Sequence, residues 1–130
     1  MTEDQLEQLC LQWFAEGGWE VTSGPEIAPN GSAPERSNYQ QVVLLADLEH
    51  ALFRINPHLP EAAIEQAIAL VTKPESLDTV ISNRYFHRLL LEGVPVDYKQ
   101  DDQFIHDRAF LIDFNQIHAN RLRAITQFTI

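Results

Sequence analysis

The stretch LLLEGVPVDYKQDDQFIHD, residues 89–107, contains the point at which the chain changes from one kind of secondary structure to another. Before Gly93 the apolar residues recur at helical spacing, and after it apolar and polar residues alternate. Glycine often ends a helix because it adopts the left-handed backbone conformation at little steric cost. We therefore predict a helix from near Ser76 to Leu91, with a possible break around Asn83, followed by strands.

The alternating region after Gly93 is typical of a β-hairpin. VPVDYK (residues 94–99) and DRAFLIDF (107–114) are the predicted strands, and QDDQFIH (100–106) is a polar tip in which the two aspartates form a turn. The last residues, RLRAITQFTI, alternate in the same way and are rich in β-branched and aromatic side chains. They predict a terminal strand over residues 122–130.

A leading amphipathic helix is predicted at the other end of the chain. Thr2 and Gln5 have the spacing of a capping box, and Gly17-Gly18 ends the helix. WEVT (residues 19–22) follows as a short strand. The apolar side chains recur at helical spacing and form one stripe, in which the single cysteine is expected to be a buried thiol: Leu6, Leu9, Cys10, Trp13 and Phe14.

The segment SGPEIAPNGSAPERS, residues 23–37, is predicted to be a surface loop because proline and glycine interrupt regular pairing. Ser37 and Gln40 repeat the capping-box spacing and open a helix that reaches about Phe53, although QVVLL within it is also compatible with a strand. The next segment, NPHLPEAAIEQAIALVTKP, predicts a helix with Pro60 in its first turn and Pro74 as its stop.

These elements predict an α+β domain, in which the leading helix packs on a small, mainly antiparallel sheet. The 130 residues suit one domain, and no apolar run approaches the roughly 20 residues that cross a bilayer. The acidic N-terminus lacks the layout of a signal peptide, so we expect a soluble, cytoplasmic chain with no membrane partner.

The net charge of −10 is unevenly distributed. The first 35 residues contain seven acidic residues and no lysine or arginine. Such a chain has no basic surface with which to hold phosphates, and Arg36, at the edge of the 23–37 loop, is thin evidence for a DNA contact there. Acidic charge is compatible with a metal site, and more often it confers solubility.

Few residues suggest a catalytic or metal-binding role. The five histidines have no metal-ligand spacing and are expected at the surface or at its boundary with the core. Phosphate-binding glycine loops and nucleophile motifs are absent. Glu7 is the most interesting acid, because helical geometry puts it beside Phe14 at the margin of the apolar stripe. It is either a solvated helix-edge residue or a carboxylate that reaches inward to a metal or a base. The histidines are His50, His58, His87, His106 and His118.

Four stretches, taken in order, resemble the opening of the restriction (R) subunit of type I restriction–modification enzymes. They are EQLCLQWFAEGGWE, NPHLPEAAIEQAIALV, NRYFHRLLLEGVPVDY and the region from LIDF to NRLRAITQFTI, and together they span essentially the whole chain. The most specific residues are Asn83–Arg84, Phe86–His87, Leu90 and Gly93–Val94, and then Asp113, Asn120 and Gln127–Phe128.

The resemblance implies a function and a fold. In that family this region begins a nuclease domain resembling the PD-(D/E)xK class, ahead of helicase-like motor domains that translocate DNA with ATP. Residues 1–130 would be the front part of that domain, with an incomplete restriction-endonuclease-like core. A helical insertion at about residues 38–92 would follow the first strand. Glu7 would match a helix glutamate that supports Mg²⁺ binding, and the partners would be double-stranded DNA and the modification and specificity subunits.

One departure from the family pattern limits the expected activity. The family's catalytic Asp and Glu-x-Lys follow the strand that matches AITQFTI, and this sequence has no Glu-x-Lys and no Walker motif. Lys99 follows Asp97 as DYK, which we interpret as ordinary strand polarity. We therefore expect these residues to be inactive alone, as a cut piece or a remnant of a longer enzyme. The alternative is a stand-alone, non-catalytic interaction module that pairs through an open sheet edge.

Overall fold

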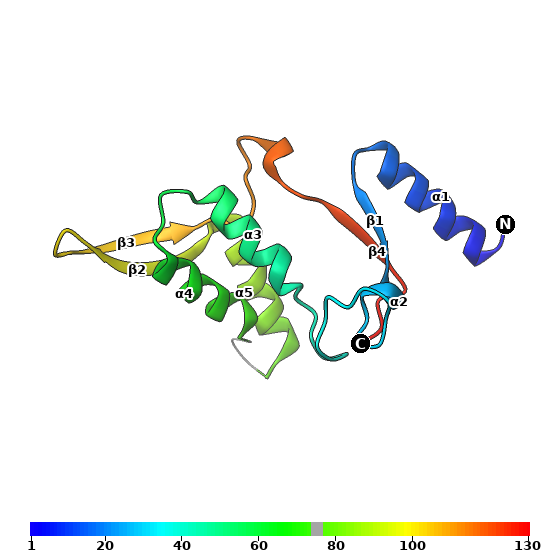
Figure 1. The fold of residues 1–130 in the computed structure, drawn as a ribbon, viewed down its shortest axis with the longest axis horizontal. Coiled ribbons are helices and arrows are strands. Elements are labelled where there is room, and N and C mark those ends of the chain that lie inside the picture. Colours follow the sequence, from blue (N-terminus) through cyan, green and yellow to red (C-terminus); the bar gives the residue numbers. More distant parts are fainter. Residues whose placement is uncertain (74–76) are drawn as a thin grey trace. The chain divides into compact units, whose positions relative to one another are not determined.

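The computed structural model of the chain describes residues 1–73 and 77–130. These residues divide into two compact units: Met1–Leu44 with Arg121–Ile130, and Leu45–Asn120. The predicted α+β class is confirmed. In the described residues the strands form two separate two-stranded sheets, one parallel and one antiparallel, where one sheet was expected (Figure 1).

The first unit contains one long helix and a parallel strand pair. The helix α1 (Glu3–Glu16) contacts β1 (Glu20–Ser23), and β1 pairs in parallel with β4 (Arg123–Thr126). Figure 1 shows α1 beside this pair. Parallel strands need a long crossover connection, and here the connection contains the whole second unit. Within this unit the leading helix therefore packs on the parallel pair.

The start of α1 is as the sequence predicts. The Thr2 side chain accepts a hydrogen bond from the backbone N–H of Gln5, and the Gln5 side chain accepts one from the Thr2 N–H. Gly17 is the C-cap. No residue of α1 is buried, however, and Cys10 is half-buried, so the expectation of a buried thiol was wrong.

The second unit consists of helices and a hairpin around one core. Its elements are α3 (Leu45–Ile55), α4 (Glu61–Thr72), α5 (Thr79–Glu92), β2 (Val94–Gln100), β3 (Gln103–Ala109) and the 3₁₀ turn η1 (Ile117–Ala119). The helix α4 covers the hairpin. The buried core joins residues of all three helices and both strands: Leu52, Leu59, Ala63, Ile64, Ala67, Leu89, Val94, Val96 and Ala109.

The transition at Gly93 is confirmed. Gly93 is the C-cap of α5 with φ +87, a left-handed conformation that other residues rarely adopt. The predicted break around Asn83 was wrong, because α5 runs without interruption. Its N-cap is Asp78, whose side chain accepts the N–H groups of Val80 and Ile81. The predicted start at Ser76, like the predicted stop of α4 at Pro74, lies outside the described residues.

The hairpin is confirmed with different boundaries. Asp101 and Asp102 form the tip, both with positive φ, as a tight two-residue hairpin turn requires. Residues 103–106, expected in the tip, belong to β3. Residues 110–114, expected in the second strand, follow its end at Ala109.

Residues 23–44 differ most from the prediction. The loop contains a short helix, α2 (Gly24–Ile27), and its Ile27 is buried. The next helix begins at Leu45 and not at Ser37. Arg36 donates hydrogen bonds to the carbonyl oxygens of Tyr39 and Gln41, and these local side-chain-to-backbone bonds compete with helical pairing of that segment.

The terminal strand is shorter than predicted. It occupies residues 123–126, and the φ of +52 at the following Gln127 turns the chain out of the extended conformation. Among residues 1–73 and 77–130, none of the helices has both the length and the apolar character needed to cross a bilayer.

Candidate functional site

The candidate site lies in the first unit, where Glu7 meets the end of β4. Gln127 Nε2 donates to both carboxylate oxygens of Glu7, at 3.2 Å to Oε1 and 3.3 Å to Oε2. Glu7 is half-buried on α1 and Gln127 is exposed. The position at the margin of the helix stripe therefore brings this carboxylate to the carboxyl end of a strand far away in the sequence.

An open pocket of about 370 Å³ lies at the carboxyl ends of the two parallel strands. In open parallel sheets this edge is the usual place for ligand sites. Tyr39 crosses the pocket wall and donates its hydroxyl to Asn30 Oδ1 at 2.8 Å. Gln127 belongs both to this pocket and to the Glu7 contact. The lining residues are Gly24, Pro25, Ala28, Asn30, Tyr39, Gln127 and Thr129.

The arginines of the first unit are engaged in internal contacts. Arg121 Nε lies 2.6 Å from Glu20 Oε2, and Arg123 binds both carboxylate oxygens of Glu35 at 2.9 and 3.0 Å. Arg36 is 4% exposed, and its guanidinium donates to three backbone carbonyl oxygens. Arg36 is therefore a structural residue and not a free cation for DNA phosphate.

The chemistry that this site offers is that of one carboxylate beside a neutral amide. Such oxygen atoms are the ligands that Mg²⁺ prefers. Among the described residues, no group of three or more His, Cys, Asp or Glu side chains could hold a metal ion. The role of Glu7 as a metal ligand stays a prediction.

All five histidines are exposed, as predicted. Two of them contact aspartates of the hairpin, namely His106 with Asp97, and His58 with Asp107 at 3.4 Å. The Arg108 backbone N–H, the Tyr98 hydroxyl and His58 together hold the pKa of Asp107 below its usual value, against the opposing effect of burial.

Tyr98 is the other group of the hairpin with a shifted pKa. Burial raises the pKa of Tyr98, and the hydrogen bond to Asp107 adds to it. Asp97 and Lys99 are both exposed on β2, which fits the interpretation of DYK as strand polarity.

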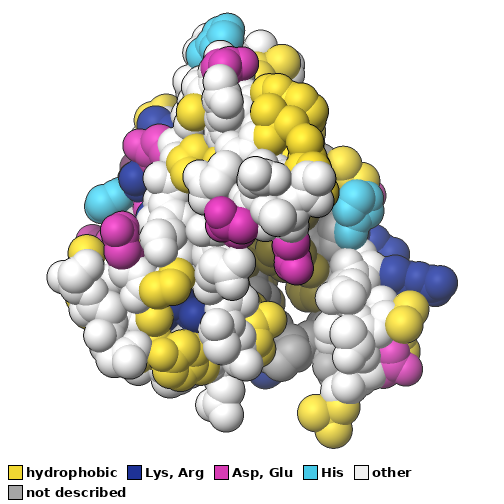
Figure 2. Space-filling view, turned by 90° about the vertical axis from the view of Figure 1, so that its right-hand side faces the viewer, with side chains coloured by type: hydrophobic (Ala, Val, Ile, Leu, Met, Phe, Trp, Pro, Cys, Tyr) yellow, Lys and Arg dark blue, Asp and Glu magenta, His cyan; other side chains and the backbone are white. Residues whose placement is uncertain are grey.

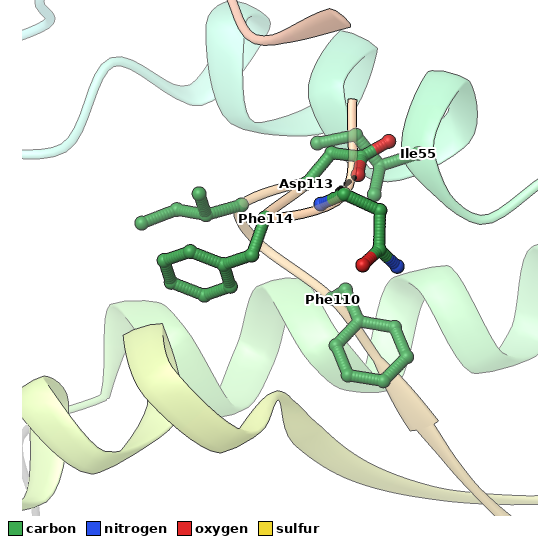
Figure 3. A pocket seen from close by; sticks show the side chains of 6 residues that line it. Ile55, Phe110, Asp113 and Phe114 are labelled. Carbon is green, nitrogen blue, oxygen red and sulfur yellow. Dashed lines mark hydrogen bonds between the residues drawn. The ribbon is translucent and has the colours of Figure 1, made fainter. Parts of the chain in front are cut away.

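A second pocket, of about 220 Å³, lies within the second unit. Figure 3 shows the side chains of Ile55, Phe110, Asp113 and Phe114 around it. Asp113 Oδ1 accepts the N–H groups of Asn115 and Gln116, so that carboxylate stabilises the turn. The pocket is bounded mainly by apolar side chains and does not contain a predicted site residue.

The segment with the most specific resemblance has contacts that account for several of its residues. Asn120 and Asp113 exchange two hydrogen bonds of 2.8 Å, from the Asp113 N–H to the Asn120 side chain and from the Asn120 amide to the Asp113 carbonyl. Phe128 stacks under Arg36, and Gln127 binds Glu7. Sequence reasoning missed the pairing of Glu7 with Gln127, because no local spacing connects two residues so far apart.

Apolar side chains also reach the surface. Figure 2 shows hydrophobic side chains, in yellow, exposed on the face that it views. On α1 the exposed fractions are 50% for Leu6, 60% for Trp13 and 41% for Phe14. The stripe that the sequence predicts is present, but within the described residues it is only partly covered, because Leu9 and Cys10 are half-buried while the other three members are exposed.

Comparison with known proteins agrees with the resemblance found in the sequence. The family model described as "Type I restriction enzyme R protein N terminus" matches residues 1–130. The chain is 32% identical over 130 residues to the Haemophilus influenzae "Type I restriction enzyme HindI endonuclease subunit", covering 100% of the chain and 12% of that protein.

A more distant relative has the same coverage. The chain is 26% identical over 131 residues to the Methanocaldococcus jannaschii "Putative type I restriction enzyme MjaIXP endonuclease subunit", again with 100% of the chain and 12% of the relative covered. The chain thus spans about an eighth of the length of these two relatives. No solved structure matches the chain significantly. Because the family model matches from the first residue to the last, the chain belongs to the family of type I restriction enzyme R protein N termini.

Proposed function

We propose that residues 1–130 form the front part of a PD-(D/E)xK-like endonuclease domain in the R subunit of a type I restriction enzyme, with a helical insertion at about residues 38–92. The parent enzyme cleaves double-stranded DNA with Mg²⁺ and translocates it with ATP, in the cytoplasm, together with modification and specificity subunits. The whole-chain family match and the names of the two relatives support this proposal.

Within that function, Glu7 is a supporting ligand of the catalytic metal. The observation that carries this role is the contact of Glu7 with Gln127, which holds a carboxylate beside a pocket at the carboxyl ends of β1 and β4. Carboxylates of such nucleases hold Mg²⁺, and the cation stabilises the charge that develops on phosphate. Further ligands would come from other parts of the subunit.

The 130 residues alone are proposed to be inactive. The sequence has no Glu-x-Lys, and its two lysines are Lys73 and Lys99. Nuclease activity in this family needs two carboxylates and a lysine in one site, and the 130 residues supply a single candidate carboxylate.

The test uses the complete R subunit in its complex. Glu7→Ala is expected to reduce DNA cleavage at least about 100-fold, because a metal ligand is lost, while ATP-driven translocation continues. Glu16→Ala, at the far end of the same helix, is the matched control and should cleave normally. Normal cleavage by Glu7→Ala would contradict the role of Glu7, and Mg²⁺-dependent cleavage by residues 1–130 would contradict their inactivity.

A stand-alone protein-interaction module is the second candidate. It is favoured by the uncovered apolar side chains of α1 and by a parallel strand pair whose outer edges meet no further strand in the described residues. Sedimentation of the 130-residue chain distinguishes the two. Self-association that depends on Trp13 and Phe14 supports the module, and a monomer at all concentrations counts against it.

A further inference from the structure

We infer that Arg84 and Arg88, on the outer face of α5, contact the phosphate backbone of duplex DNA, an inference that rests on the DNA-cleaving function proposed above. These two guanidiniums differ from those of the other arginines in the chain. In the described residues every other arginine donates a hydrogen bond within the protein, whereas Arg84 and Arg88 have no hydrogen bond or ion pair. The engaged arginines are Arg36, Arg54, Arg108, Arg121 and Arg123.

Helical geometry puts Arg84 and Arg88 on the side of α5 that is turned away from the core. Leu89, which is 3% exposed, anchors the helix in the core, and Tyr85 packs against that core. At about 100° per residue, Arg84 lies about 140° and Arg88 about 100° around the helix from Leu89, in the same direction. Both arginine side chains are exposed. Both guanidiniums are therefore accessible to a ligand from solvent.

The charge on this face is positive although the chain as a whole is acidic. Residues 79–91 contain no aspartate or glutamate, and His87, which is also exposed, lies between the two arginines. Glu92 follows Arg88 by one helical turn, and in the part of the chain that the structure describes no ion pair joins them. The overall charge of −10 thus conceals a small surface whose cations have no counter-ion from the protein.

The spacing of the two arginines suits a phosphate backbone. Side chains one turn apart on a helix have Cβ atoms about 5–6 Å from each other. Each strand of duplex DNA carries one negative charge for about every 3.4 Å of the helix axis. Two long side chains with this spacing can reach neighbouring phosphates of one strand. The planar guanidinium fork also matches phosphate oxygens in pairs, which strengthens each contact.

A protein surface rich in acidic side chains is the other partner that these cations would suit. Leu91, which is 56% exposed on the same side of α5, would suit that partner as well. The DNA backbone is the occupant to which we commit, because the charged groups on this face are cations and the enzyme proposed above moves along a duplex. Phosphate contacts hold DNA in position independently of its base sequence, as such movement requires.

The experiment measures binding of the complete R subunit to a fluorescently labelled DNA duplex, by anisotropy, from about 50 to about 200 mM salt. Each phosphate contact contributes about 0.9 to the slope of log affinity against log salt concentration. Arg84→Gln and Arg88→Gln should each make the slope less steep by about 0.9, and the double variant by about 1.8. Over this fourfold salt range the wild type should therefore lose about 12-fold more affinity than the double variant.

Two controls separate charge from structure. Arg54→Gln removes an exposed arginine of the same unit whose guanidinium is bound to the Ala119 carbonyl oxygen at 2.8 Å, and it should leave the slope unchanged. The Arg84→Lys, Arg88→Lys double variant keeps both charges and should keep the wild-type slope. If the lysine variant loses as much slope as the glutamine variant, a change in the fold accounts for the loss and the inference is wrong.

The inference and the proposed function fail separately. A wild-type slope in the glutamine double variant, in a complex that still cleaves DNA, overturns the role of the two arginines and leaves the function intact. A wild-type slope combined with weaker binding of the modification and specificity subunits assigns this face to a protein partner and also overturns the inference. A complete R subunit that neither binds nor cleaves duplex DNA overturns both.

Discussion

The guanidinium of Arg36 stacks on the ring of Phe128, with 3.9 Å between the guanidinium carbon and the ring centre. The same guanidinium donates to the carbonyl oxygens of Tyr39, Gln41 and Thr129, at 2.7–2.8 Å. One buried side chain thus joins the segment after α2 to the segment after β4, which is also the segment that presents Gln127 to Glu7.

Arg36→Leu is expected to destabilise the first unit by about 2–4 kcal/mol, because charge-assisted hydrogen bonds to three carbonyl oxygens and the stacking contact are lost. The measurement is urea unfolding followed by tryptophan fluorescence, since both tryptophans, Trp13 and Trp19, belong to this unit. Arg54→Leu is the control, because exposed Arg54 donates one bond in the other unit. Equal effects of the two substitutions on the free energy of unfolding would refute this stabilising role of Arg36.

Gly24→Ala tests the close approach of β1 and β4 at their carboxyl ends. The added Cβ would overlap backbone carbonyl oxygens, so the strand ends must move apart, at a cost of about 1–3 kcal/mol. Gly17→Ala is a matched control, since a Cβ there meets its nearest atoms at 3.5 Å and the φ of −80 suits alanine. If Gly24→Ala unfolds at the wild-type temperature, the backbone at Gly24 does not lie against the carbonyl oxygens of Thr126 and Gln127.

Asn56 makes a buried connection in the second unit. It is 1% exposed, donates to the carbonyl oxygens of Leu52 and Phe110, and accepts the Phe110 N–H at 2.7 Å. Asn56→Ala should cost about 2–4 kcal/mol, because buried polar groups lose their partners. Hydrogen exchange of the Phe110 N–H should accelerate. The control is Asn83→Ala on the exposed side of α5, and protection unchanged from wild type in Asn56→Ala would argue against this connection.

Asp107 gives the second unit a defined pH dependence. Because the Arg108 N–H, the Tyr98 hydroxyl and His58 hold its folded-state pKa below the ordinary 3.8, its ionisation stabilises the fold above that value. The stabilisation is lost as the pH falls through the lower folded-state pKa. Asp107→Asn should therefore be less stable than wild type near neutral pH and should approach it in acid.

The free energy of unfolding, measured by urea titration from about pH 7 to about pH 2, tests this prediction. Tyr98→Phe removes one of the donors to Asp107 and should give a smaller effect with the same sign. A difference between wild type and Asp107→Asn that stays constant over the whole range would exclude the ionisation of Asp107 as its cause.

Local sequence signals predicted the elements that depend on local physics. The capping box at Thr2, the helix end at Gly93 and the turn at Asp101-Asp102 each need only a few neighbouring residues, and each is present. The helix predicted from the capping-box spacing at Ser37 is not formed. The buried side chain of Arg36 binds carbonyl oxygens of that segment, which helical hydrogen bonds would otherwise use.

The sequence by itself determined the α+β class, the family and the helix on which Glu7 lies, since periodicity, caps and motif order are written along the chain. Only the tertiary structure decided that β1 pairs in parallel with β4 and that Gln127 binds Glu7. The contacts between these elements join residues about one hundred or more positions apart. Such contacts depend on tertiary packing, here on the close approach at Gly24 and on the hydrogen bond from Arg36 to the Thr129 carbonyl oxygen. The local spacing of residues along the sequence does not indicate these contacts.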